Sequence, residues 1–134
     1  MNNQEQIINW NYRLPRNCSP IENFLLPLKQ KIETAIMNNQ KLHIILDGRE
    51  VDKISMNNKM KMDAFWKRYK KQLAENIYFT TIFVDNEDQQ KKLEKIYQTS
   101  NSTTPYKIFL YSEYQEHLMK QEHTEEVSNN VVVN

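Results

Sequence analysis

Glycine is almost absent from this chain, which has 134 residues and a single glycine, Gly48. An average composition would give roughly nine. The phosphate-binding loops GxGxxG and GxxxxGK[ST] need several residues without a Cβ atom, so Rossmann-type dinucleotide binding and P-loop nucleotide binding are excluded. Gly48 directly follows Asp47, where we expect a turn with a positive φ angle.

Cysteine is equally scarce, since Cys18 is the only one in the chain. An intramolecular disulfide and a cysteine-based zinc site are therefore excluded. Because Cys18 precedes a predicted helix, a reactive thiolate is one interpretation, although no histidine is paired with it by pattern. The sequence contains no recognisable cofactor motif.

Long hydrophobic runs are also missing, and the apolar stretches fall far short of the ~20 residues that a membrane span needs. Residues 1–6 are polar and lack the pattern of a secretory signal. The net charge is only +1, so composition gives no reason to expect nucleic acid as a partner. With 39% hydrophobic and 26% charged residues, we expect a soluble protein in the cytoplasm.

Hydrophobic periodicity predicts strands that alternate with helices along the chain. Strands are predicted at residues 7–14, 42–46, 78–84 and 106–111, and helices at residues 20–37, 59–76, 87–98 and 112–122.

Polar residues three apart stand at three of the predicted helix starts, as in N-terminal capping pairs. Pro20 would then occupy the first helical position of its helix, and Pro27 would kink that helix or mark the start of its main body. The three pairs are Ser19 with Glu22, Asn86 with Gln89, and Ser112 with Gln115.

The order β-α-β-α-β-α-β-α predicts an α/β fold with a four- to five-stranded, mainly parallel sheet. We expect right-handed crossovers, helices on both faces of the sheet, and ligands at the carboxyl ends of the strands. A single domain should cover residues 7–123, with a flexible N-terminus over residues 1–6 and a disordered tail over residues 124–134.

Two carboxylates, Asp47 and Asp85, follow the two strands expected at the centre of the sheet. Such a pair could bind Mg²⁺, which favours a metal-dependent receiver-like protein or a small enzyme. A receiver would also need an acidic pair after its first strand and a lysine after a late strand, and the chain has neither. Without a further catalytic constellation, the alternative explanation is structural: both aspartates end strands, and Asp85-Asn86 caps a helix.

Positive charge is concentrated between residues 53 and 71, and within the second predicted helix it is densest at residues 67–71. A patch of this kind could bind phosphate, an acidic protein or an anionic surface, or it could simply be a solvated helix face. Its four cations are Lys67, Arg68, Lys70 and Lys71. Because the C-terminus is acidic, self-association into a homodimer is a further alternative.

The chain resembles the STAS-like proteins (sulphate transporter and anti-sigma-factor antagonist), in particular small stand-alone domains grouped with CRAL-TRIO-like domains. The resemblance rests on residues 24–28 (Phe-Leu-Leu-Pro-Leu), on residues 44–47 (Ile-Ile-Leu-Asp), and on the aromatic second helix. It implies a regulatory protein-binding module without enzymatic activity. Anti-sigma antagonists carry a phosphorylatable serine at the start of that helix, and Ser55 is the nearest match, without their Asp-Ser pair.

Together these features predict a non-enzymatic module that binds a protein partner or an anionic ligand, without a metal or cofactor. The binding residues are expected in the loop after the second strand and on the second helix. They are Asp47, Gly48, Arg49, Ser55, Lys67, Arg68, Lys70 and Lys71. The alternatives are the receiver-like or enzymatic use of Asp47 and Asp85, and binding of an apolar or lipid ligand.

Overall fold

The computed structural model describes residues 6–99 and 104–120, so the expectation of a disordered tail over residues 124–134 lies outside the described residues. The elements follow in the order β1 (Gln6–Arg13), α1 (Glu22–Met37), β2 (Gln40–Asp47), α2 (Met56–Arg68), α3 (Lys70–Asn76), β3 (Ile77–Val84), α4 (Glu87–Thr99) and β4 (Tyr106–Leu110). A further helix covers residues 111–120. Among these helices, none is both long and apolar enough to cross a membrane.

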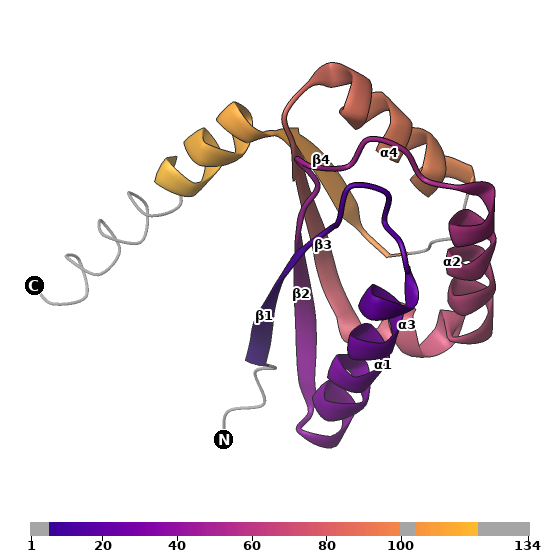
Figure 1. The fold of residues 1–134 in the computed structure, drawn as a ribbon. Helices are drawn as coiled ribbons and strands as arrows, with labels where there is room; N and C mark the ends of the chain where they lie inside the picture. The colour runs from indigo at the N-terminus through magenta and orange to yellow at the C-terminus, as the bar shows by residue number, and fades with distance from the viewer. Residues whose placement is uncertain (1–5, 100–103, 121–134) are drawn as a thin grey trace, which may run out of the picture.

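The sheet has four strands in the order β1-β2-β3-β4, and every pair is parallel. This confirms the α/β class with a mainly parallel sheet (Figure 1). The two apolar strands β2 and β3 lie in the centre, where both of their edges are hydrogen-bonded, whereas the more polar β1 lies at one edge. Composition therefore matches position in the sheet.

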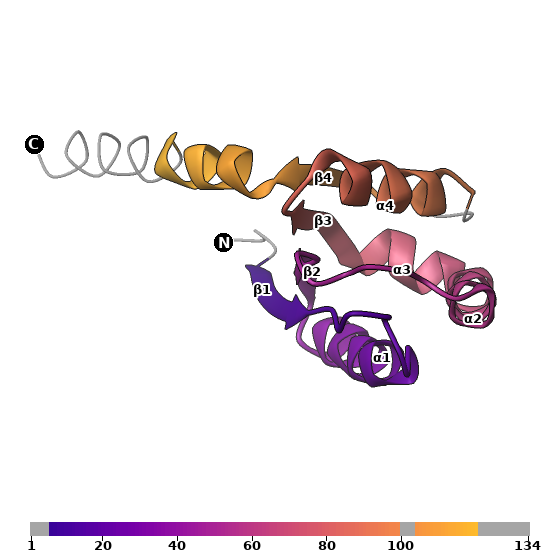
Figure 2. The ribbon, with the colours of Figure 1, turned by 45° about the horizontal axis from the view of Figure 1, so that its top comes forward.

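The helices are distributed unevenly over the two faces of the sheet. Helices α1, α2, α3 and α4 all lie on one face, and only the helix of residues 111–120 extends to the other side (Figure 2). The strand order never reverses, so each right-handed crossover places its helix on the same face. The expectation of helices on both faces is met only by this last helix.

Alternating side chains of each strand divide the sheet into a core face and an opposite face. On the core face, β2 contributes Leu42, Ile44 and Leu46, which are all buried under the helices. We call the opposite side the open face. Its residues are Ile7, Asn9, Asn11, Arg13, Lys41, His43, Ile45, Asp47, Phe79, Thr81, Phe83, Lys107 and Phe109.

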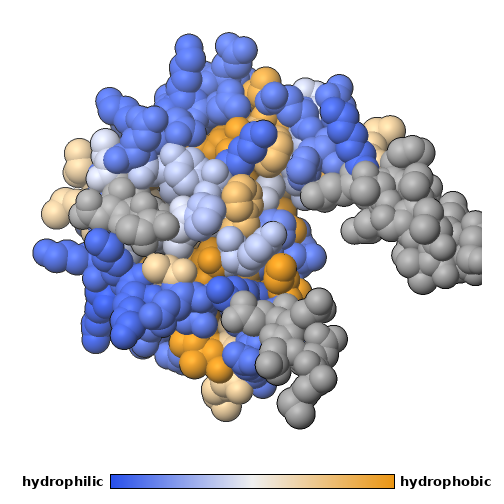
Figure 3. Space-filling view, turned by 180° about the vertical axis from the view of Figure 1, so that it is seen from behind, coloured by the Kyte–Doolittle hydropathy of each residue, from blue (hydrophilic) through white to orange (hydrophobic). Residues whose placement is uncertain are grey.

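The surface of the molecule is not uniformly polar. On the side turned away from the viewer in Figure 1, hydrophobic side chains form an interrupted band between hydrophilic margins (Figure 3). Apolar surface is therefore left exposed outside the helix-covered core.

Two of the three predicted capping pairs are wrong. Helix α1 begins at Glu22 after Ile21, and no side chain caps it, because the carbonyls of Pro20 and Ile21 already accept the first amide hydrogens. Ser112 lies inside the last helix, and the side chain of Glu113 accepts from the amide of Leu110 instead, at 3.0 Å.

The third capping pair is confirmed at the start of α4. The side chain of Asn86 accepts from the amide of Gln89 at 2.9 Å, and the side chain of Gln89 accepts from the amide of Asp85 at 2.8 Å. The polar residues between β3 and α4 therefore satisfy amides that the first turn of α4 leaves unpaired.

Gly48 does not have the expected positive φ angle. A Cβ atom at this position would lie 3.3 Å from Val84 Cγ1, 3.4 Å from Leu93 Cδ1 and 3.4 Å from the carbonyl oxygen of Phe83. The amide of Gly48 also donates to that carbonyl, at 2.8 Å. A larger residue here would therefore be crowded by β3 and α4, and this close packing, not a turn with a positive φ angle, is what favours glycine.

Candidate functional site

The carboxyl edge of the sheet is dominated by an ion pair between Asp47 and Arg49. The Arg49 side chain donates to Asp47 Oδ1 through Nε at 3.0 Å and to Oδ2 through Nη2 at 3.0 Å, and the Arg49 amide also donates to Oδ1 at 3.1 Å. Partial burial alone would raise the pKa of the Asp47 carboxyl, but the hydrogen bonds from Arg49 outweigh it, so this pKa is lowered. Both carboxylate oxygens are therefore occupied by a partner two residues away.

Aromatic rings hold the guanidinium of Arg49 in place. Its Cζ atom lies 4.2 Å from the ring centroid of Tyr111 and 5.4 Å from that of Phe83. The hydrogen bond to Asp47 raises the pKa of Arg49, so the cation is fixed. The Arg49 side chain thereby connects the end of β2 to the start of the last helix.

The rest of this edge is also held together by hydrogen bonds and ion pairs between its own residues. Gln89 Nε2 donates to the carbonyls of Arg49 and Val51, both at 2.8 Å, and so joins the loop after β2 to α4. Two exposed ion pairs continue the pattern, Arg13 with Glu50 and Arg16 with Asp52. The charged side chains of β1, β2 and the loops that follow them at this edge thus bind one another.

The proposed magnesium ligands do not form a metal site in the part of the chain that the structure describes. No group of three or more His, Cys, Asp or Glu side chains there could hold a metal ion. Asp47 would first have to release Arg49, and Asp85 is exposed. The geometry thus favours the structural explanation of the two aspartates.

Ser55 lies at the start of α2 and caps it. Its side chain accepts from the amide of Asn58 at 3.1 Å, and the buried Asn58 side chain donates to the carbonyl of Asn17 at 3.4 Å. Ser55 is exposed and shares an open polar hollow with Lys53. Its present role is to begin the helix and fix it to the loop after β1.

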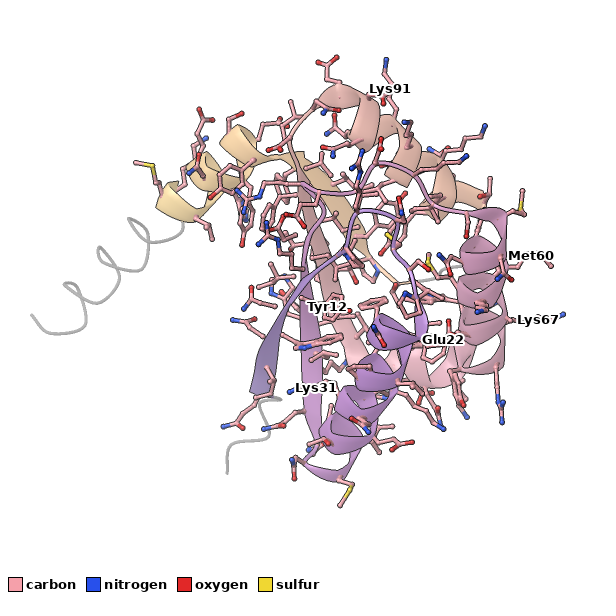
Figure 4. The ribbon with its side chains drawn as sticks, viewed as in Figure 1. Tyr12, Glu22, Lys31, Met60, Lys67 and Lys91 are labelled. Carbon is pink, nitrogen blue, oxygen red and sulfur yellow. The ribbon has the colours of Figure 1, made fainter. Side chains whose placement is uncertain are left out.

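The four cations predicted as a binding patch lie at the junction of α2 and α3, where Tyr69 interrupts the helix. All four are exposed, and Lys67, Lys70 and Lys71 have no ion pair among the described residues. Lys67 extends from the outer side of α2 into solvent (Figure 4). We call these four residues the basic surface.

Two kinds of neighbour adjoin the basic surface in the structure: the cation of Lys29 beside Tyr69, and two exposed methionines on α2. Lys29 of α1 lies 5.3 Å from the ring centroid of Tyr69, and Arg68 lies 5.4 Å from the same ring. Met56 and Met60 are exposed on α2, and because Met60 follows Met56 by four residues and precedes Lys67 by seven, the three side chains lie along one stripe of the helix. Only the packing of α1 on α3 brings Lys29 here, whereas the stripe of Met56, Met60 and Lys67 follows from their i, i+4, i+11 spacing in the sequence.

The eight predicted binding residues do not form one site. Ser55 and Lys67 are separated by almost the full length of α2, about 18 Å at 1.5 Å per residue. Asp47, Gly48 and Arg49 belong to the crosslinked edge. The basic surface is therefore a separate feature.

The interior offers little room for an apolar ligand. A cavity of about 40 Å³ lies between the sheet and the helices, lined by Cys18, Trp66 and Tyr97 among others. Small-molecule pockets usually measure about 300–1,000 Å³. Burial raises the pKa of the Cys18 thiol to about 11, so Cys18 is a neutral, buried thiol at pH 7 and not the reactive thiolate.

No family model matches this chain, and no significant match exists among curated proteins or solved structures. The resemblance to STAS-like proteins therefore stays a prediction that these comparisons do not test.

Proposed function

We propose that this protein is a non-enzymatic binding module whose basic surface docks an acidic segment of a partner protein. The observation that carries the proposal is the contrast in pairing, because within residues 6–99 and 104–120 the cations at the junction of α2 and α3 lack ion pairs whereas those at the sheet edge have them. A regulatory, STAS-like role and a cytoplasmic location belong to the same proposal.

The exposed methionines favour a protein partner over a free phosphate. Met60 lies on the outer side of α2 with Lys67 (Figure 4), and the exposed Met56 falls on the same stripe by its helical spacing, so a ligand that fits this face needs apolar as well as anionic groups. Methionine is common at such surfaces because its unbranched side chain adapts to different partners. An acidic peptide with leucine side chains has the required chemistry.

Charge reversal with a matched control tests this proposal. Lys67→Glu/Lys71→Glu removes two cations from the basic surface, and Lys31→Glu/Lys91→Glu changes the net charge equally on α1 and α4, where these lysines are exposed and unpaired within the described residues (Figure 4). The probe is a synthetic peptide of alternating glutamate and leucine. The NMR amide shifts caused by the peptide should fall on α2 and α3, and peptide binding should weaken as salt is added. The peptide affinity should fall at least tenfold in Lys67→Glu/Lys71→Glu and stay unchanged in Lys31→Glu/Lys91→Glu.

Two further titrations separate the alternatives. Inorganic phosphate should give no saturable shift, because Lys67 extends from α2 into solvent, where a single ammonium group holds phosphate only weakly (Figure 4). Equal loss of peptide binding in both double variants would show that net charge, and not this surface, carries the interaction. Peptide shifts at the carboxyl edge of the sheet would also contradict the proposal.

A further inference from the structure

In the described part of the molecule, the open face of the sheet lacks the layer of helices that covers the core face. Sheets in which all strands are parallel occur almost only with both faces covered. Here α1, α2, α3 and α4 cover one face only (Figure 2). The uncovered part lies over β1, β2 and the start of β3, where Ile7 is 46% exposed and Tyr78 is 52% exposed.

A polar row is built into this face and is held rigid. His43 Nδ1 lies 3.1 Å from Asn9 Oδ1, and His43 Nε2 lies 2.8 Å from Thr81 Oγ1, so three strands are joined by one imidazole ring. Tyr78 and Phe79 both contact that ring, because the register shifts between β2 and β3 at this point. The open face is therefore a preformed surface of apolar and hydrogen-bonded groups.

The helix of residues 111–120 covers this face only near the carboxyl ends of β3 and β4. The ring of Tyr114 stacks on Phe83 at 4.6 Å, and His117 contacts Phe109 at 5.3 Å. The helix then leaves the body of the molecule (Figures 1 and 2). At its distal end Met119 is 68% exposed, so the helix carries apolar surface that its own chain does not bury.

We propose that a second copy of this chain completes the fold, with the helix of residues 111–120 of each copy lying over the β1–β2 part of the open face of the other. The two surfaces are complementary within one chain. The helix offers the exposed carboxylate of Glu116 and the apolar side chain of Met119, and the β1–β2 part of the open face offers the exposed side-chain amides of Asn9 and Asn11, which can donate to a carboxylate, and the exposed side chain of Ile7. A twofold arrangement forms each of these contacts twice.

Self-complementarity is what favours a second copy over an unrelated partner. A foreign protein could cover the open face, but it would leave the projecting helix with its apolar end in water. When each copy places its helix of residues 111–120 on the open face of the other, both surfaces of both copies are covered, as expected for a closed dimer.

Sedimentation velocity on the full chain tests the proposal through two methionines of nearly equal exposure. Wild type should sediment with twice the chain mass of 16.2 kDa. Met119→Glu, on the projecting helix, should shift the protein to monomer, with a Kd at least tenfold higher. Met60→Glu, at a methionine 63% exposed on α2, should leave the dimer intact. Circular dichroism checks that both variants fold.

Crosslinking identifies the surfaces independently of any loss of stability. Asn11→Cys on the open face, mixed with Met119→Cys on the helix, should give a disulfide-linked pair of chains, whereas Asn11→Cys with Met60→Cys should not. Cys18 is buried and does not compete. A chain that stays monomeric at about 1 mM, where even a micromolar dimer would form, overturns the proposal. A dimer that is unchanged by Met119→Glu also overturns it.

Discussion

The carboxyl edge of the sheet and the basic surface both carry charged side chains, but they differ in what those charges do. At the edge, Arg49 binds Asp47 through both carboxylate oxygens and stacks on Tyr111. At the junction of α2 and α3, Lys67 and Lys71 extend into water without an ion pair among the described residues.

This difference shows that a charged residue at the carboxyl edge of a parallel sheet is not by that position alone a ligand-binding residue. The edge is where ligands usually bind in parallel α/β proteins. In this chain, however, the edge is filled by its own contacts, since Gln89 and Arg49 connect three elements there. The binding that we propose therefore falls to a helix surface on the periphery.

The largest expected effect concerns how tightly the edge is packed. Gly48→Val places methyl groups where a Cβ already meets Val84 and Leu93 at 3.3–3.4 Å, so we expect the free energy of unfolding to fall by about 1–3 kcal/mol. Ala74→Val, at an exposed position of α3, should cost only about 0.5 kcal/mol through helix propensity. Urea unfolding measures the loss of stability in both variants. Equal losses would contradict the conclusion that the sheet edge is tightly packed at Gly48.

The ion pair at the edge should contribute stability that depends on pH. Asp47→Asn should lower the free energy of unfolding by about 1–2 kcal/mol at pH 7, because Arg49 loses its charged acceptor. Since the pKa of Asp47 is lowered in the fold, this contribution is complete above the ordinary aspartate pKa of 3.8 and is lost as the pH falls through the lowered value.

Urea unfolding of wild type and variant between about pH 7 and pH 2 measures that dependence, and the two curves should converge at the acid end. The control is Asp88→Asn, which removes a well-exposed i, i+4 pair with Lys92 and should cost at most about 0.5 kcal/mol. A constant gap between wild type and Asp47→Asn at every pH would disprove the assignment.

Sequence reasoning found the fold class because its evidence was local. The apolar strand from Leu42 to Leu46, the stretch from Tyr78 to Val84, and the cap at Asn86 each depend on neighbours in the chain. What it missed depends on tertiary packing. The proximity of Lys29 to Tyr69, the stacking of Arg49 on Tyr111, and the one-sided arrangement of helices all follow from the order of strands, which no local pattern encodes.

The start of α2 should respond more strongly to loss of a hydroxyl than the start of α1. Ser55→Ala removes the acceptor for the amide of Asn58, so we expect about 1 kcal/mol less stability. Ser19→Ala should change little, because Ser19 caps nothing in α1 despite its capping-box sequence. Thermal and urea unfolding of the two variants distinguish a cap that exists from one that only the sequence pattern predicted; a larger loss for Ser19→Ala would reverse this conclusion.

The smallest expected effect is on the basic surface itself. Lys67→Glu places a carboxylate in the last turn of α2, which is unfavourable to the helix dipole, while Lys71→Glu places one in the first turn of α3, which is favourable. The two effects oppose each other, and neither lysine has an ion pair to lose among the described residues. The double variant should therefore keep the wild-type free energy of unfolding to within about 0.5 kcal/mol in urea titrations. A loss well above that would mean that these lysines are engaged in structure, as the charges at the sheet edge are, and the basic surface could then no longer be treated as free to bind a partner.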